Sequence, residues 1–454
     1  MSKIQNDNLF YKLLCISVKF VYKLFFRQIE IRGTENVPTG EPVIFAPNHQ
    51  NALLDALAVL FYQKDPIVFM ARADIFQNKI IARLLGILKI APIFRIRDGF
   101  ENLSKNEEQM KVAEDVLLDN SKLCLMPEGN QGNQHKLRPL VKGLFRIAYS
   151  AEGLLQGKSH VKIIPVGIDC SYYQHAGCDL VLTYGKPIEV KDYIGLYKEN
   201  SSSALNVLRN VLSDRMSQIM HHIGSTSHYE IIYNLCCFGT PAYLEVQAGK
   251  GVAIKATTRA GLCFDARCAL GKILDKIDAE NPEIILELDA YCSQLKKLPG
   301  YPTEITELIE QKKTTTYNII SIMLSIIILP GFIMNFPAWL MNHLICRKVD
   351  DKQMYSTFAF TIGILFNAFV YIFLTFIIWI IFKTNIIQTI VGFIIISFIG
   401  LVCERVRQTL RITFRSVFYS FGSRKVQLKK CKADYALLKE ALKNKLRDTI
   451  YISK

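Results

Sequence analysis

Several signatures that define common enzyme classes are missing from this chain of 454 residues. The 12 cysteines form no C-x-x-C pair and no grouping with histidine at metal-ligand spacing, so we predict reduced, buried thiols and no metal site. The absence of G-x-S-x-G argues against a serine hydrolase, and the absence of a P-loop argues against nucleotide-driven transport. We expect no cleavable export signal, because lysines interrupt the first apolar run.

Apolar residues and positive charge are abundant instead. Half of the residues are hydrophobic, more than a soluble enzyme needs, and the formal net charge is +15. The charge is concentrated in residues 404–454, which contain 14 Lys and Arg against 4 Asp and Glu, a net of +10. A basic segment beside apolar segments predicts contact with an anionic lipid surface. We predict no nucleic-acid partner, since neither a zinc module nor an aromatic-interleaved binding sheet is visible.

Residues 313–403 form the predicted membrane domain. Residues 356–382 and 384–403 are apolar and long enough to span a bilayer, with Lys383 between them. Basic residues flank the outer ends of this pair, so we expect these ends and the catalytic domain on the cytoplasmic face. Residues 317–345 are uncharged but contain two prolines, which favours a re-entrant hairpin over a single crossing.

Amphipathic helices are predicted at both ends of the chain. In residues 1–27 four cations recur on one helical stripe beside a wide apolar face, which indicates a helix in the membrane interface; a core helix of the soluble domain is the alternative. In residues 404–454 an apolar stripe from Leu428 to Leu446 predicts a helix that binds the membrane surface, a partner helix or the catalytic domain. The N-terminal cations are Lys12, Lys19, Lys23 and Arg27.

Residues 28–224 alternate short apolar strands with helical segments. This alternation predicts an α/β fold in which a mostly parallel sheet is flanked by helices. Ligands of such sheets bind beyond the carboxyl ends of the strands. Residues 225–312 carry helical periodicity without a motif, and we predict an accessory, mostly helical region there. The predicted strands are residues 28–32, 42–46, 67–71, 91–96, 123–126 and 163–168.

The most informative stretch follows the second predicted strand. Within residues 42–64, His49 is the only histidine and Asp55 is the only acidic residue. A neutral imidazole can take a proton from an alcohol, and a carboxylate on its other nitrogen fixes the tautomer and stabilises the imidazolium. We therefore predict catalytic roles for His49, in the turn before a helix, and for Asp55, in the first turns of that helix. A helix start capped by Asn48 is the alternative.

Two further clusters carry candidate substrate-binding residues. Arg95 and Arg97 stand two apart at a predicted strand end, where guanidinium groups can bind a phosphate; surface ion pairs are the alternative. Glu128 and Gly129 follow another strand, so the carboxylate can hold a substrate hydroxyl or a neighbouring arginine while the glycine permits a tight turn. A plain turn with a solvated carboxylate is the alternative there.

Basic residues after Gly129 extend the candidate binding site. Lys142 can complete a phosphate pocket, and so can Arg138 and His135. Ordinary surface positions for these three side chains fit the sequence equally well.

Four blocks of the sequence, in their order along the chain, resemble the phospholipid and glycerol acyltransferase superfamily. This superfamily includes the glycerol-3-phosphate and 1-acylglycerol-3-phosphate O-acyltransferases. The resemblance covers roughly residues 28–220, and the chain departs from the common pattern in two places. Five residues instead of four separate His49 from Asp55, as in a fungal-type branch, and Asn130-Gln131 stands where the family usually has Thr-Arg. The blocks are residues 47–55, 91–99, 125–130 and 161–167.

The resemblance implies a membrane-bound O-acyltransferase of phospholipid biosynthesis. It would move a fatty-acyl group from acyl-CoA or acyl carrier protein to a hydroxyl of a glycerol phosphate or lysophosphatidate, with His49 as base and Arg95 and Glu128 positioning the acceptor. No metal or tightly bound cofactor is expected, because the thioester is already activated. Two alternatives are a catalytically inactive lipid-binding membrane scaffold and an acyltransferase for a lipid that is not a glycerophosphate.

Overall fold

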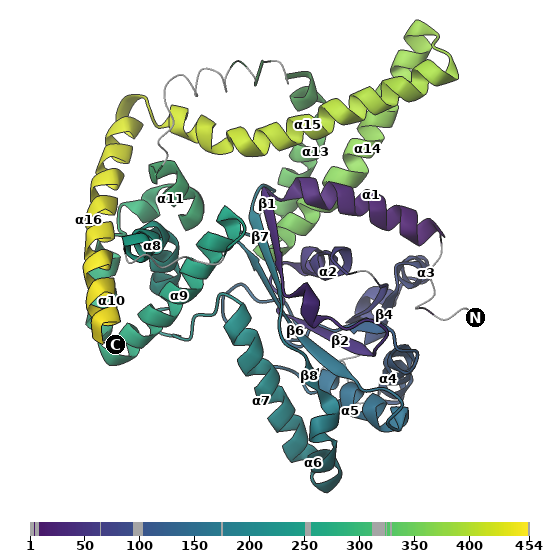
Figure 1. The fold of residues 1–454 in the computed structure, drawn as a ribbon. Coiled ribbons are helices and arrows are strands. Elements are labelled where there is room, and N and C mark those ends of the chain that lie inside the picture. The colour runs from purple at the N-terminus through teal and green to yellow at the C-terminus, as the bar shows by residue number, and fades with distance from the viewer. Residues whose placement is uncertain are drawn as a thin grey trace. The chain divides into compact units, whose positions relative to one another are not determined.

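The computed structural model describes residues 4, 9–63, 65–93, 103–173, 176–249, 256–310, 323, 325–326 and 329–452. The chain divides into two compact units. Unit 1 contains most of the sheet, and unit 2 is built mainly of helices (Figure 1). Unit 1 comprises Met1–Phe20, Glu30–Asp169 and Val181–Met220, and unit 2 comprises Val21–Ile29, Cys170–Leu180 and His221–Lys454.

An eight-stranded sheet forms the centre of unit 1. Its order is β1-β7-β6-β2-β5-β3-β4, with β8 paired to β6. The four pairs from β6 to β4 are parallel, and β8 is antiparallel to β6. The predicted α/β fold with a mostly parallel sheet is therefore confirmed. The strands are β1 (Gln28–Arg32), β2 (Val43–Pro47), β3 (Ile67–Arg72), β4 (Ile90–Ile93), β5 (Lys122–Cys124), β6 (Lys162–Cys170), β7 (Asp179–Tyr184) and β8 (Ile188–Glu189).

Helices cover both faces of this sheet, so all five residues of β2 are buried. Ile44 and Ala46 join an apolar core with α4, α5 and α7, while Val43 and Phe45 point to the opposite face, where α2 lies (Figure 1). The helices are α1 (Leu9–Phe25), α2 (Ala52–Phe61), α3 (Lys79–Ile87), α4 (Leu103–Leu118), α5 (Gly143–Leu155), α6 (Ile194–Glu199) and α7 (Ser201–Ile219). The 3-10 turns are η1 (Thr34–Asn36), η2 (Ala73–Phe76) and η5 (Val190–Tyr193).

The register of the central strands brings their carboxyl ends to one edge. Val43 of β2 lies beside Lys122 of β5 on one side and Lys162 of β6 on the other. His49 comes two residues after β2, and Glu128 comes four residues after β5. The fold therefore places the predicted base and the predicted acidic anchor at the same edge of the sheet, which is the edge where ligands of parallel sheets bind.

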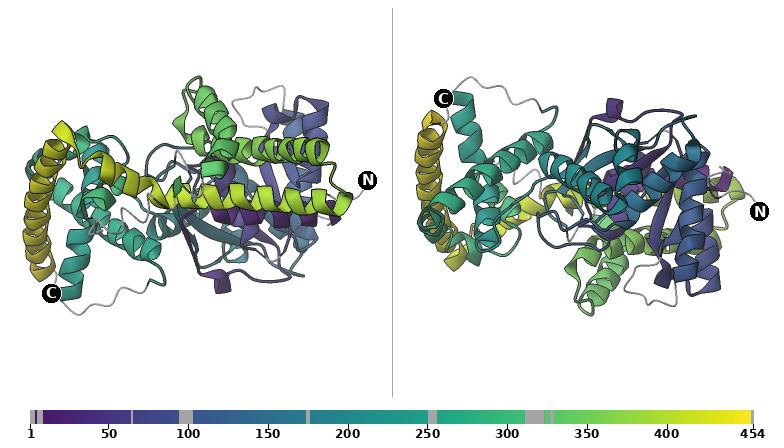
Figure 2. Two further views of the ribbon diagram at one scale, coloured as in Figure 1. Left: turned by 90° about the horizontal axis from the view of Figure 1, so that it is seen from above. Right: turned by 90° about the horizontal axis from the view of Figure 1, so that it is seen from below.

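Unit 2 contains a second apolar core, formed by α8, α9, α10, α11 and α16. Figure 2 shows α16, in yellow, beside the accessory helices in both views. The buried side chains of α16 are those of the predicted apolar stripe: Cys431, Tyr435, Leu438, Leu442 and Leu446. Of the three predicted targets of this stripe, the structure shows a partner helix, chiefly α8. The helices are α8 (Tyr229–Gly249), α9 (Arg259–Glu280), α10 (Pro282–Ala290), η6 (Leu295–Lys297), α11 (Pro302–Glu310) and α16 (Gly422–Ile452).

Two helices in unit 2 are long and apolar enough to cross a membrane, over residues Lys352–Phe382 and Ile386–Gln408. They belong to η7 (Lys352–Met354) with α14 (Tyr355–Phe382) and to α15 (Ile386–Phe418). A capping box between Asn385 and Gln388 starts α15 two residues later than the predicted span. The helix then continues beyond the predicted end at 403, because no proline or glycine interrupts residues 401–418.

The segment before these spans contains one further helix. Residues Leu329–Cys346 form α13, which includes Pro337, so the chain does not reverse within these residues. A re-entrant or kinked course for the whole segment 317–345 stays a prediction. Most of residues 317–328, the first part of the predicted hairpin, lies outside the described residues.

Candidate active site

His49 lies in the turn between β2 and α2. Its Nδ1 is 3.0 Å from Oδ2 of Asp55, which lies in the first turn of α2. The imidazole keeps 18% of its surface exposed, whereas the carboxylate keeps 2%. The structure thus brings together the two residues predicted as base and orienter. With Nδ1 held by the carboxylate, Nε2 is the nitrogen that can meet a substrate.

The turn between His49 and Asp55 contains an unusual backbone conformation. Ala52, the first residue of α2, has a φ of 42°, in the left-handed region that residues with a side chain rarely adopt. Although five residues separate His49 from Asp55, the ring nitrogen and the carboxylate oxygen are 3.0 Å apart. The longer spacing is therefore compatible with the contact between histidine and aspartate.

One oxygen of Asp55 organises the whole turn. Besides the imidazole, Oδ2 accepts hydrogen bonds from the backbone N–H groups of Gln50 at 2.8 Å and Asn51 at 2.7 Å. The carboxylate consequently fixes the path of the main chain after His49 as well as the orientation of its ring. Removing it would disturb both.

Glu128, in the loop that follows the neighbouring strand β5, forms hydrogen bonds to the same turn. Its Oε1 accepts the backbone N–H of His49 at 2.9 Å, and its Oε2 accepts Nε–H of Arg138 at 3.1 Å and the Arg138 backbone N–H at 3.2 Å. Of the two predicted partners of this carboxylate, the structure shows the arginine. Burial raises the pKa of Glu128, and the donors on His49 and Arg138, together with the arginine charge, oppose that rise.

Asn48 is a buried site residue whose role the sequence did not indicate. Its Oδ1 accepts the N–H of Ile168 at 2.6 Å, and its Nδ2 donates to the Ile168 carbonyl at 2.9 Å. This two-way link ties the turn after β2 to the end of β6. The alternative in which Asn48 caps α2 is wrong, because Asn51 occupies the N-cap position.

Arg138 packs against Gly132 in the loop that follows Glu128. A Cβ atom at Gly132 would lie 3.1 Å from Nε of Arg138, so the glycine leaves room for the guanidinium group. The N–H of Gly132 donates to the carbonyl of His49 at 2.9 Å, which places this loop beside the turn of the base. Among the residues that the structure describes, buried Nη2 of Arg138 has no hydrogen-bond partner. A buried guanidinium nitrogen without a partner is unusual, and a bound anion is one group that would satisfy it.

The other predicted binding residues divide into two groups. Gly129, with a φ of 71°, closes the turn after β5 through an N–H···O bond of 3.1 Å to Met126, and Lys142 is the N-cap residue of α5. Arg95 and Arg97 lie outside the described residues.

Comparison with known proteins gives this cluster its context. A family model described as Acyltransferase matches residues 28–169, which contain His49, Asp55, Glu128 and Arg138. Residues 28–169 form an acyltransferase domain. The domain belongs to the phospholipid and glycerol acyltransferase superfamily.

Similar proteins include 1-acyl-sn-glycerol-3-phosphate acyltransferase alpha of Mus musculus and of Homo sapiens. The first is 26% identical over 155 residues, 34% of this chain and 49% of its own length, and the second is 24% identical over 167 residues, 37% and 53%. This chain thus spans about half the length of the curated relatives it matches. The solved 1-acyl-sn-glycerophosphate (LPA) acyltransferase PlsC of Thermotoga maritima aligns over 45% of this chain and 80% of its own, with 18% identity and a TM-score of 0.32.

Histidine–carboxylate pairs also occur elsewhere in the described chain, so the contact alone does not define the site. His135 lies 3.4 Å from Asp169, but it is more deeply buried than His49. His160, 2.7 Å from Glu152, precedes β6 at the amino end of that strand, and His228 pairs with Asp278 in unit 2. The His49 pair of the acyltransferase domain combines a partly exposed ring, a place at the carboxyl edge and a backbone held by Glu128.

Proposed function

We propose that the protein is a membrane-bound O-acyltransferase that transfers a fatty-acyl group from an acyl thioester to a hydroxyl of a glycerol phosphate or lysophosphatidate. The observation that carries the proposal is the 3.0 Å contact between His49 Nδ1 and Asp55 Oδ2 at the carboxyl edge of the sheet, inside an acyltransferase domain. The relatives named 1-acyl-sn-glycerol-3-phosphate acyltransferases support this class of acceptor. Phospholipid biosynthesis is the process in which such a product is used.

The proposed reaction passes through one tetrahedral intermediate. His49 Nε2 takes the proton of the acceptor hydroxyl as its oxygen attacks the thioester carbonyl, and Asp55 stabilises the imidazolium that forms. The C–S bond then breaks, the new C–O ester bond remains, and the proton on His49 goes to the departing sulfur. The thiol leaves and the imidazole is neutral again. Acyl-CoA and acyl carrier protein are the donor classes that fit this chemistry.

The acceptor phosphate requires cationic partners near the base. Glu128 accepts two N–H groups of Arg138 and one of His49, so it holds the guanidinium and the base in a fixed relation. We assign Glu128 a positioning role and Arg138 the role of binding the phosphate through Nη2. Gly129 permits the tight turn, and Lys142 together with Arg95 and Arg97 would add positive charge around the phosphate.

Membrane attachment is part of the proposal. The two long apolar helices, α14 and α15, have the length and composition of spans. Basic residues lie beyond the outer ends of this pair, which favours the cytoplasmic face for the catalytic domain. An enzyme held in the membrane would meet both its acyl donor and its lipid acceptor at the bilayer, where these substrates accumulate.

An acyl-transfer assay tests the function directly. The purified full chain in lipid vesicles would be given labelled acyl-CoA or acyl carrier protein with glycerol 3-phosphate, dihydroxyacetone phosphate or lysophosphatidate. We expect an acylated glycerophosphate product, and we expect His49→Ala to lower its rate at least about 10³-fold without changing the melting temperature, because the base is lost and the fold is kept.

A matched control separates the base from the general effect of losing a histidine. His228→Ala removes a ring that is paired with Asp278 at 2.6 Å in unit 2. It should leave the rate unchanged. Equal rates for wild type and His49→Ala would refute the mechanism, and no transfer to any acceptor by folded wild type would favour the inactive lipid-binding scaffold. Transfer only to a lipid without a glycerol phosphate would favour the other alternative.

A further inference from the structure

The surface of η2 and α3 is an apolar patch on unit 1. Helix α3 has no buried residue, and four of its apolar side chains and one from η2 are between 37% and 72% exposed. Solvent-exposed stripes of this kind on a helix mark a contact with a partner or a membrane. We call these side chains the α3 patch: Ile75, Ile80, Ile81, Leu84 and Ile87.

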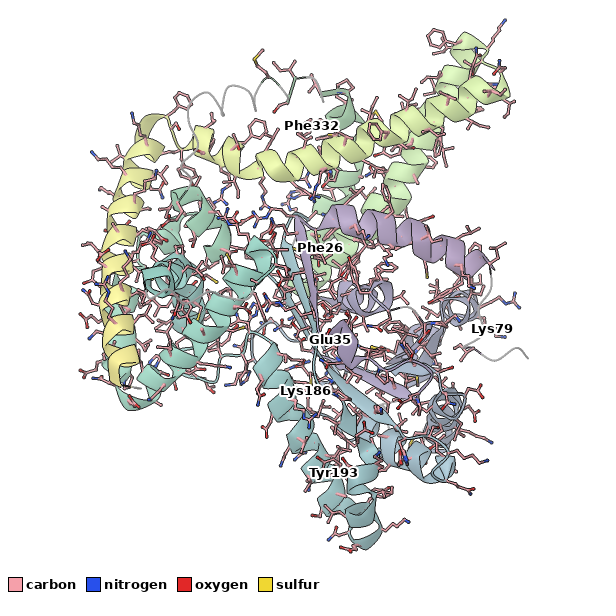
Figure 3. The ribbon with its side chains drawn as sticks, viewed as in Figure 1. Phe26, Glu35, Lys79, Lys186, Tyr193 and Phe332 are labelled. Atoms are coloured by element: carbon pink, nitrogen blue, oxygen red, sulfur yellow. The ribbon has the colours of Figure 1, made fainter. Side chains whose placement is uncertain are left out.

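The charged side chains on α3 are both cations, Lys79 and Arg83. The acidic residue of η2, Asp74, forms an ion pair with Arg72. Lys79 and Arg83 are one helical turn apart and flank the stripe formed by Ile80 and Leu84. Figure 3 labels Lys79 at the outer edge of unit 1. An apolar stripe bordered by cations is the pattern of a helix that lies in the interface of an anionic bilayer.

A second exposed apolar face lies next to the α3 patch, on α1. Lys89, two residues after α3, places Nζ 4.9 Å from the centre of the Tyr11 ring, so the first turn of α1 lies close to the segment that follows α3. Helix α1 carries lysines and no acidic residue. Its exposed apolar side chains within unit 1 are Leu9, Phe10, Leu13, Ile16 and Phe20.

The α3 patch also lies near the edge of the sheet that carries the base. The turn η2 follows β3 directly, at the carboxyl end of that strand. Because β3 and β2 both lie parallel to β5, this end belongs to the same edge of the sheet as His49. A bilayer in contact with η2 and α3 would therefore reach the acyltransferase domain at the edge of the sheet that carries His49.

We propose that the α3 patch inserts into the interface of an anionic bilayer, so that the acyltransferase domain contacts the membrane through its own surface in addition to the predicted spans. A bilayer fits better than a second protein, since the same chain carries two helices able to cross a membrane and the apolar stripe of α3 lies beside Lys79 and Arg83. This proposal does not depend on the catalytic activity.

Quenching of a tryptophan by brominated lipids tests the proposal on the full chain. The background is Trp339→Phe/Trp379→Phe, which removes both native tryptophans. Leu84→Trp would report on the α3 patch, and Leu154→Trp, at a 52% exposed position on α5, is the matched control. Both variants would be reconstituted in vesicles of phosphatidylcholine and phosphatidylglycerol with and without dibrominated phosphatidylcholine.

We expect the indole at position 84 to be quenched at least twofold more than the indole at position 154, because only the former would lie among acyl chains. Adding Lys79→Glu/Arg83→Glu should reduce this difference in anionic vesicles. An unquenched, red-shifted indole at position 84 would mean that water covers the patch, and an unquenched, blue-shifted one would mean that a second copy covers it. Either result overturns the proposal.

A measurement without substitutions covers the case in which the tryptophan-free background does not fold. Wild-type protein would be crosslinked in vesicles that contain a photoactivatable phosphatidylglycerol, and adducts would be located by mass spectrometry. We expect adducts on the peptide with residues 75–87 and none on the peptide with residues 143–155. Adducts on both peptides at equal frequency, or on the second alone, contradict the proposal.

Discussion

Buried polar side chains serve different purposes in the two units. Around His49, the side chains of Asp55 and Glu128 bond to backbone N–H groups, and Asn48 bonds to both main-chain groups of Ile168, so that one ring is fixed at a point. In the bundle of α13, α14 and α15 the polar groups join helices to one another.

Asn335 of α13 is the centre of that second arrangement. It is fully buried, donates from Nδ2 to the carbonyl of Gly400 on α15 at 2.9 Å, and accepts the hydroxyl of Tyr371 on α14 at 2.7 Å. Glycines let the helices approach: a Cβ at Gly331 would lie 2.5 Å from Cβ of Cys403. The comparison predicts that substitutions in the His49 cluster change the reaction rate, whereas substitutions in the bundle change stability.

The largest expected effect is on the rate, from Asp55→Asn. The amide oxygen can still accept the N–H groups of Gln50 and Asn51 and Nδ1–H of His49, but a neutral amide does not stabilise the imidazolium as a carboxylate does. We expect the rate of acyl transfer to fall roughly 10³- to 10⁴-fold. The melting temperature should change little, and a large drop in it would show that Asp55 serves the fold first.

Arg138 offers the next largest effect, on acceptor affinity. Charged hydrogen bonds contribute about 1.5–3 kcal/mol, so Arg138→Gln should raise the KM for the phosphate-bearing acceptor roughly 10- to 100-fold, with the KM for the acyl donor unchanged. Adding Gln131→Arg, which restores the arginine usual in the family, should recover part of the loss. Arg146→Gln on α5 is the control. A KM unaffected by Arg138→Gln would remove the assigned role.

Stability of the bundle is tested by Gly331→Ala. The new methyl group would meet Cβ of Cys403 and, at 3.1 Å, the carbonyl oxygen of Ile399, so we expect a loss of roughly 1–3 kcal/mol in the free energy of unfolding. Gly363→Ala and Gly392→Ala are matched controls, because no atom lies within 4 Å of their added Cβ. Activity below the melting temperature should be retained. Equal melting temperatures for all three variants would contradict the close approach.

The smallest expected effect is on the pH dependence of stability. Since burial raises the pKa of Glu128, the native state binds its proton more tightly than the unfolded chain does. Stability relative to Glu128→Gln should therefore be greatest at low pH and fall as the pH rises from the ordinary value of 4.5 through the raised pKa. Melting temperatures of both proteins between pH 4 and 8 would measure this. If the melting temperature of the wild type rose relative to that of Glu128→Gln as the pH increased, the prediction would be contradicted.

The sequence predicted the elements that depend on local pattern. Alternating strands and helices predicted the parallel sheet, and the isolated pair of His49 and Asp55 predicted their contact, because both residues lie in one turn and its helix. An arginine partner for Glu128 was among the predictions, but the bond to the His49 backbone was not, since it joins segments 79 residues apart through loop conformations. The stripe on α16 predicted a buried face, but periodicity cannot specify that α8 covers it.

The left-handed residue at the start of α2 has a consequence for how such proteins are found. A search that requires four positions between the two partners of the dyad would discard this chain, although a turn that includes the left-handed Ala52 holds them at hydrogen-bonding distance. A criterion written in space, as the separation of ring nitrogen and carboxylate oxygen beyond a strand, would tolerate insertions of this kind. Homologues rejected for a lengthened motif therefore warrant a second inspection by geometry.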